Sequence, residues 1–256
     1  MALASATACC GAFQSKEDRY KKEMECALRV TDEKSIEILQ RGMFCCEKLP
    51  AEVKTLPEAR RFYLLRAAAQ DPKNPDPVLQ IARSYWDDHD YKQALDFFAR
   101  AKDLSPKPLT AVIGEITMLR LTKDWTQANG LVQWVRDQKA IDSQKVGDYL
   151  EARILYDQGK YAEARPLFES ALNRSTSDGD ALGDTPYSMK DAHLYLAQIK
   201  LKAGDAQGAY GDFKLFLQKM SNPDFQLFYK YWVEKLGNDQ PALYDKIESD
   251  WASWRQ

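Results

Sequence analysis

Histidine, the side chain most often used in general acid–base catalysis, occurs only twice in this chain of 256 residues, as His89 and His193. Neither histidine has a serine, cysteine or carboxylate at the spacing of a nucleophile–base pair. The sequence also has no zinc-protease, phosphate-loop, nucleophile-elbow or dinucleotide-binding motif. The acidic segment 178–184 departs from the residue order of an EF-hand loop and lacks its closing glutamate. We therefore expect no enzyme activity, no metal site and no cofactor.

The five cysteines could form a metal site or disulfides, and all of them lie near the start of the chain. They are Cys9, Cys10, Cys26, Cys45 and Cys46. Zinc is disfavoured because the sequence has no C-x-x-C pair and no histidine near the cysteines. Suppose that residues 16–30 and 34–48 form helices that fold back on each other about residues 31–32. With a rise of about 1.5 Å per residue, this hairpin holds Cys26 and Cys45 too far apart for a disulfide, which needs Cα atoms within about 7 Å.

Other states of the cysteines stay open. Cys9 or Cys10 could reach Cys45 or Cys46 more easily, and free thiols in a reducing cytosol are the alternative. The small residues before Cys9 resemble the end of a bacterial lipoprotein signal, in which the cysteine takes the lipid. No basic or apolar region precedes them, so export by this route needs a start upstream. Residues 1–14 are then a disordered or lipidated tether with Cys9 as the lipidation candidate, and S-palmitoylation of Cys9 and Cys10 is a further alternative.

A repeat is the strongest pattern in the rest of the chain, and it predicts the helices that must position any functional side chain. Its central alanines are Ala94, Ala128, Ala164 and Ala209. They are 34, 36 and 45 residues apart (128 − 94, 164 − 128 and 209 − 164). Ala94 has Tyr91 three residues before it, Phe98 four after and Ala101 seven after, and Ala164 has the same types in the same places. Ala128 and Ala209 keep the pattern more loosely.

This pattern resembles the tetratricopeptide repeat, a helix–turn–helix unit of about 34 residues. Two antiparallel helices cross closely only where small residues occupy the contact, and the large residues beside each alanine fill the grooves to the next unit. The resemblance implies an all-α protein, a right-handed superhelical solenoid of tetratricopeptide helix hairpins. Its exposed end needs a cap, and helices expected at 224–236 and 241–254 would form a C-terminal capping pair.

The repeats also predict how the chain is organised. Residues 15–74 hold N-terminal helices with a degenerate repeat centred on Ala59, whose first helix is short or broken because Pro50 and Pro57 interrupt it. Four repeats follow in 75–223, with a polar loop inserted at 175–188, and the cap takes up 224–256.

In this family the first helix of each unit lines a concave groove that binds a partner. Carried onto this chain, the groove positions include Leu79, Arg83, Trp86, Arg120, Tyr149, Arg153 and Tyr156. The lysines and asparagines with which chaperone-binding members hold a terminal carboxylate are absent from these positions. An aromatic and apolar surface with three arginines suits an extended segment or amphipathic helix that carries hydrophobic anchors and some acidic residues.

Charge and hydropathy narrow the class of partner. The chain has 36 Lys and Arg against 38 Asp and Glu, a formal net charge of −2, whereas nucleic-acid binders usually carry a basic excess. No apolar stretch approaches the roughly 20 residues of a membrane-spanning helix, so a membrane is expected only through a lipid anchor. We expect a non-catalytic scaffold for protein–protein interaction. One hypothesis is a cell-envelope lipoprotein that assists assembly of a multiprotein machine, similar to pilotins. The other is a cytoplasmic adaptor or chaperone-like protein.

Overall fold

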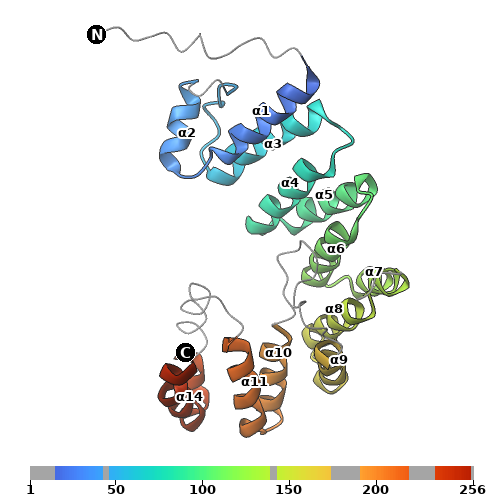
Figure 1. Ribbon diagram of the computed structural model, residues 1–256, viewed down its shortest axis with the longest axis vertical. Coiled ribbons are helices and arrows are strands. Elements are labelled where there is room, and N and C mark those ends of the chain that lie inside the picture. The colour runs from blue at the N-terminus through green and yellow to red at the C-terminus, as the bar shows by residue number, and fades with distance from the viewer. Residues whose placement is uncertain (1–14, 43–45, 139–142, 174–190, 219–233, 255–256) are drawn as a thin grey trace. The chain divides into compact units, whose positions relative to one another are not determined.

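The computed structural model describes residues 15–42, 46–138, 143–173, 191–218 and 234–254, and the chain is a helical solenoid of antiparallel hairpins (Figure 1). It divides into two compact units, residues 1–124 and 125–256. The tether 1–14 with Cys9 and Cys10, the inserted loop 175–188 and Cys45 all lie outside the described residues.

The first unit stacks its helices in an order that differs from the sequence at one point. Its helices are α1 (Lys16–Leu28), α2 (Glu33–Gln40), α3 (Leu56–Gln70), α4 (Pro75–Asp87), α5 (Tyr91–Leu104) and α6 (Leu109–Leu121). Helix α1 packs along α3 (Figure 1), α3 packs on α4, and α4 pairs with α5, which contacts α6. The hairpin that contains Ala59 is therefore built from α1 and α3, which are separated in the sequence by α2.

The second unit follows chain order. Its helices are α7 (Trp125–Asp137), α8 (Ser143–Asp157), α9 (Tyr161–Asn173), α10 (Asp191–Lys202), α11 (Ala206–Gln218), α13 (Glu234–Asp239) and α14 (Pro241–Trp254). Each of α7 to α11 packs on the next, and α14 covers α11. Leu243 and Ile247 of α14 lie in one apolar cluster with Ala209 and Phe213 of α11. The first capping helix, expected at 224–236, lies almost wholly outside the described residues.

The turn inside each of the four repeats has one shared geometry. The fifth residue before each central alanine has a left-handed φ, namely 61° at His89, 63° at Lys123, 77° at Gly159 and 78° at Gly204. Its amide bonds to the carbonyl three residues back and the next amide to the carbonyl five back, as in Gly159 N to Tyr156 O and Lys160 N to Leu155 O, both 2.9 Å. This is a Schellman cap, in which only a left-handed residue lets the last carbonyls of the helix be bonded. The shared cap confirms the repeat register, and all four central alanines are 0% exposed.

The degenerate repeat is split: α1 serves as its first helix, and the segment before α3, where a short or broken helix was expected, holds only the eight-residue α2 among its described residues. Helix α1 takes the place of the first helix, because Glu23 contacts Arg66, which lies seven residues after the central Ala59. In the following repeat Val78 and Ala101, seven residues after its own alanine, share one core cluster in the same way. Pro57 does not interrupt α3, because it lies in the first turn, where a proline amide has no partner to lose.

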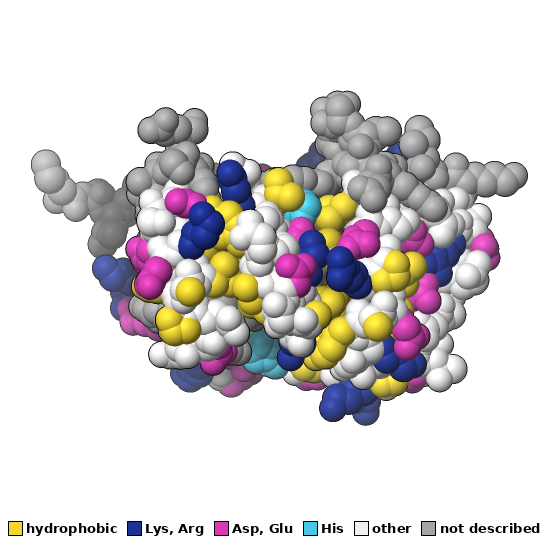
Figure 2. Space-filling view, turned by 90° about the horizontal axis from the view of Figure 1, so that it is seen from below, with side chains coloured by type: hydrophobic (Ala, Val, Ile, Leu, Met, Phe, Trp, Pro, Cys, Tyr) yellow, Lys and Arg dark blue, Asp and Glu magenta, His cyan; other side chains and the backbone are white. Residues whose placement is uncertain are grey.

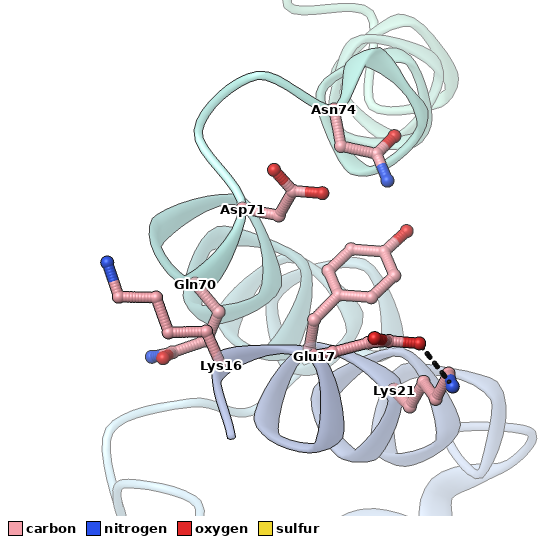
Figure 3. A pocket seen from close by; sticks show the side chains of 7 residues that line it. Lys16, Glu17, Lys21, Gln70, Asp71 and Asn74 are labelled. Atoms are coloured by element: carbon pink, nitrogen blue, oxygen red, sulfur yellow. Dashed lines mark hydrogen bonds and ion pairs between the residues drawn. The ribbon is translucent and has the colours of Figure 1, made fainter.

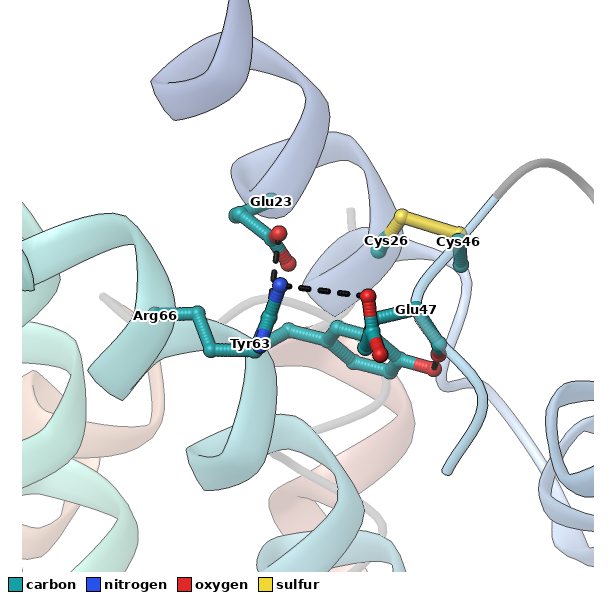
Figure 4. Close-up of a disulfide and its surroundings, with 6 residues drawn as sticks. All are labelled: Glu23, Cys26, Cys46, Glu47, Tyr63 and Arg66. Atoms are coloured by element: carbon teal, nitrogen blue, oxygen red, sulfur yellow. Dashed lines mark hydrogen bonds and ion pairs between the residues drawn. A yellow bond between two sulfur atoms is a disulfide. The ribbon is translucent and has the colours of Figure 1, made fainter. Parts of the chain in front are cut away.

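The helix supposed at 34–48 is too long, and this changes the pairing of the cysteines. Helix α2 ends at Gln40, and Gly42 follows with a φ of 73°. The chain then reverses, so that the amide of Leu49 bonds to the carbonyl of Leu39 at 3.2 Å. This reversal brings Cys46 back to α1, where it forms a disulfide with Cys26 with the Cα atoms 5.8 Å apart (Figure 4). The free-thiol interpretation is therefore wrong for these two cysteines.

Candidate functional site

The predicted groove residues of the first unit lie on α4 and α6. Leu79 and Trp86 of α4 are half-buried and pack against the core formed by Ala82, Ala94, Phe98 and Met118. Arg83 lies on the same helix, one turn from each of them, and is also half-buried. Arg120 is half-buried in the last turn of α6. Part of each side chain therefore supports the helix packing, and the remainder is open to solvent.

In the second unit the predicted residues Tyr149, Arg153 and Tyr156 of α8 meet two residues of α10. The Arg153 guanidinium donates to the Tyr149 hydroxyl at 2.9 Å and lies 4.4 Å from the centre of the Tyr195 ring. The Tyr156 hydroxyl donates to Oε1 of Gln198, and its ring meets that of Tyr195 edge-on at 4.8 Å between centres. We name these five residues the α8–α10 cluster.

The members of the α8–α10 cluster differ in exposure. Tyr149 is 1% exposed, so its ring contacts the core residue Phe168 rather than solvent. Arg153, Tyr156, Tyr195 and Gln198 are half-buried. Arg153 is held from two sides, by a hydrogen bond and by ring stacking, and its guanidinium keeps its charge at any ordinary pH. The cluster thus holds a fixed cation beside the rings of Tyr149 and Tyr195.

Burial fixes the protonation of the two α8 tyrosines. Burial raises the pKa of Tyr149 to about 12, opposed in part by the Arg153 guanidinium. Burial likewise raises the pKa of Tyr156 to about 12, and Tyr161 acts in the same direction. Both hydroxyls therefore remain protonated at neutral pH and act as neutral hydrogen-bond partners.

Tyr195 was missed among the groove positions. When the family's groove positions are counted back from Ala209, they include Leu194 and Gln198 on α10, and Tyr195 follows the first of these by one residue. Its aromatic type was the available signal, because tyrosine and arginine are enriched where partners bind. Its ring also stacks on Phe168 with the centres 5.3 Å apart, which fixes its place against α9.

His193, the one histidine inside a repeat helix, belongs to a buried charged group. Its Nδ1 lies 3.3 Å from Oδ1 of Asp212 on α11, and Lys200 Nζ lies 2.6 Å from the other oxygen of that carboxylate. The group joins the two helices of one hairpin and contains no nucleophile. Within the described parts of the chain, no group of three His, Cys, Asp or Glu side chains could hold a metal ion.

A cavity of about 520 Å³ opens between the start of α1 and the end of α3 (Figure 3). Its walls mix both charges, with Lys16, Glu17 and Lys21 on one side and Asp71 with Asn74 on the other. Lys21 is already paired with Glu17 at 2.7 Å. The cavity therefore favours neither an anion nor a cation.

The surface charge is mixed as well. On the face drawn in Figure 2, Lys and Arg side chains lie among Asp and Glu side chains and apolar patches rather than forming a field of one sign. A nucleic acid needs such a basic field, so this face does not suit one. None of the helices, over the residues that the structure describes, is long and apolar enough to cross a membrane.

Comparison with known proteins identifies the repeat. Residues 149–219 match the family model of the tetratricopeptide repeat. These residues are tetratricopeptide repeats. The matched residues run from the middle of α8 to the end of α11 and include all members of the α8–α10 cluster. A comparison of the chain with curated proteins found no match.

Two solved structures resemble this chain over most of its length. MamA of Desulfovibrio magneticus RS-1, from residue 41 to its end, is 17% identical, with a TM-score of 0.50 over 78% of this chain and 94% of that one. PilF of Pseudomonas aeruginosa is 14% identical, with a TM-score of 0.54 over 92% of this chain and 99% of that one. At these identities the likeness concerns the fold.

Proposed function

We propose that this chain is a non-catalytic scaffold for protein–protein interaction, which binds a segment of a partner protein on the face formed by α8 and α10. The observation that carries the proposal is the α8–α10 cluster, in which Arg153 is fixed between Tyr149 and Tyr195. Side chains that are already ordered lose little conformational entropy on binding. Tyrosine and arginine are also the types that contribute most binding energy at interfaces.

The chemistry of the cluster defines the partner. A guanidinium donates two parallel hydrogen bonds to a carboxylate, and the rings of Tyr156 and Tyr195 offer flat apolar surface beside it. The segment that fits carries an aspartate, a glutamate or a terminal carboxylate next to an aromatic or branched aliphatic side chain. Leu79, Arg83 and Trp86 in the first unit, together with Arg120, offer the same combination of types, and we propose that they bind in the same way.

A random peptide library displayed on phage tests this proposal with the full chain as bait. We expect the selected peptides to share an acidic residue beside an apolar one, and to lose at least tenfold in affinity against the variant Arg153→Gln. The matched control is Arg165→Gln on α9, because Arg165 pairs with Glu169 at 2.9 Å outside the cluster. Equal binding to Arg153→Gln and the parent, with circular dichroism unchanged, would place the binding face elsewhere.

A finer proposal concerns the cell envelope, where Cys9 would carry a lipid and the scaffold would assist assembly of a multiprotein machine. Expression from the native locus with its upstream DNA, in the presence of a clickable fatty acid, tests it. Label that is present in the parent and lost in Cys9→Ser supports the lipoprotein. Absence of label in both favours the adaptor or chaperone-like alternative.

A further inference from the structure

Helix α1 has little in its own sequence to hold it on α3. It has 13 residues and buries only Glu23, Cys26 and Ala27. A helix of this length is marginal in water by itself, and packing of an apolar face normally stabilises it. The place that Val78 takes in the next repeat is taken here by the charged Glu23. Contacts with other parts of the chain must therefore supply the stability that the small apolar face of α1 does not provide.

Those links run through the residues around Cys46 (Figure 4). Arg66 of α3 donates to Glu23 of α1 at 3.1 Å and lies 3.4 Å from the Glu47 carboxylate. The Tyr63 hydroxyl donates to the backbone carbonyl of Glu47 at 2.7 Å. The segment 46–47 thus lies between α1 and α3. It is joined to α1 by the disulfide and to α3 by the hydrogen bond and the ion pair.

The disulfide changes the connection between the two helices of the split repeat. Without it, α1 is joined to α3 by residues 29–55, which include α2. With it, Cys26 of α1 is joined directly to Cys46, and only residues 47–55 remain before α3. A shorter connection lowers the entropy that is lost when α1 docks.

We propose that docking of α1, and with it completion of the first repeat, depends on oxidation of Cys26 and Cys46, and that the chain reaches its full fold in an oxidising compartment. One cysteine thiolate attacks a disulfide oxidant such as oxidised glutathione and releases one of its thiols. The second cysteine then displaces the other thiol, so two electrons and two protons pass to the oxidant as the Cys26–Cys46 bond forms. Disulfides of this kind persist outside the reducing cytosol.

The disulfide acts during folding and not as a reversible switch. Cys26 is 2% exposed and Cys46 is 8% exposed. An attacking thiolate must approach a sulfur directly, so it cannot reach this bond until the packing around the two cysteines opens. Once formed, the bond is therefore protected by the packing that it makes possible.

Hydrogen exchange on the full chain tests the proposal. The parent is refolded with oxidised glutathione and compared with the double variant Cys26→Ser/Cys46→Ser, with Cys45→Ser as the matched control that keeps the bond. We expect exchange of α1 amides to rise at least tenfold in the double variant, with α4, α5, α8 and α9 unchanged. Equal protection of α1 would overturn the proposal. Loss of protection throughout the chain would also overturn it, because the bond would then hold more than the first repeat.

The compartment is tested separately in the native host. Cells are quenched with acid, free thiols are blocked with a maleimide, and the protein is digested and analysed by mass spectrometry. We expect the peptide that joins Cys26 to Cys46 and little of either cysteine in blocked form. If both cysteines are found blocked, they are reduced thiols in the cell. The proposed oxidising compartment is then wrong, whatever the exchange experiment gives.

Discussion

The guanidinium of Arg153 lies 4.4 Å from the centre of the Tyr195 ring, although the two residues belong to different repeats. Arg153 also donates to Tyr149 on its own helix at 2.9 Å. The two contacts require the planar shape of arginine, because one edge of the group bonds while its face stacks. The Arg153 side chain therefore links α8 to α10, and this structural role is separate from any binding of a partner.

We expect Arg153→Lys to destabilise the protein by about 1–3 kcal/mol, because a lysine keeps the charge but loses the stacked plane and the directed bond. Urea unfolding of the full chain measures this. Arg165→Lys is the matched substitution, and the exposed pair of Arg165 with Glu169 predicts a change of no more than about 1 kcal/mol. Equal effects of the two substitutions would show that the contact with Tyr195 contributes nothing.

Gly114 provides a second test, because it lies where α6 meets α5. A Cβ atom at this position would lie 2.3 Å from Cε1 of Phe98. We expect Gly114→Ala to cost about 1–3 kcal/mol, because the buried ring of Phe98 must move. Gly130→Ala in α7 is the control, since nothing lies within 4 Å of its added carbon. Gly130→Ala should stabilise the protein by up to about 1 kcal/mol through helix propensity. Thermal unfolding measures both variants, and a change of stability with the same sign in both would contradict the packing of Gly114 against Phe98.

The repeats could be predicted because their signals are local and periodic. The central alanine, its aromatic neighbours and the turn five residues earlier lie within one short segment, and each reports one physical need of the hairpin. Such a pattern survives even where His89 and Lys123 replace glycine at the left-handed position. The fold class and the register therefore followed from the residues alone.

The split repeat could not be predicted because its evidence is non-local. The sequence alone predicts that Glu23 is exposed to solvent. Its partner Arg66 lies 43 positions away, and only the fold brings the two together. The end of α2 has a local signal, since Gly42 is a typical residue after a helix. A helix that continues from there to residue 48 holds Cys46 away from Cys26, so the disulfide follows only when the helix ends before Gly42. The α8–α10 cluster was partly found, because its α8 members stand at family positions and Tyr195 does not.

High pH should weaken the second unit through its buried tyrosines. The pKa of Tyr149 is raised from 10.0 to about 12 in the folded chain by burial. Between those values the unfolded chain has lost the proton and the folded chain retains it, so the free energy of unfolding falls as pH rises. Below pH 10 the two states bind the proton equally and this contribution to stability is fully present. Urea unfolding from pH 8 to pH 11 should show the decline, and Tyr149→Phe should make it shallower; an identical slope would assign the decline to other groups.

The left-handed turns give a prediction with opposite signs at equivalent positions. Lys123 and Gly159 each stand five residues before a central alanine, with φ of 63° and 77°. A side chain at such a φ costs about 1 kcal/mol, because Cβ crowds the backbone, whereas glycine has no such cost. We therefore expect Lys123→Gly to gain up to about 1 kcal/mol, less the greater entropy that glycine has in the unfolded chain, and Gly159→Ala to lose about 1 kcal/mol. Nothing lies within 4 Å of a Cβ at Gly159, so the loss would be backbone strain and not a clash. Thermal unfolding of both variants and of the double variant checks the pair, and a stabilising Gly159→Ala would mean that this turn does not hold the left-handed conformation in solution.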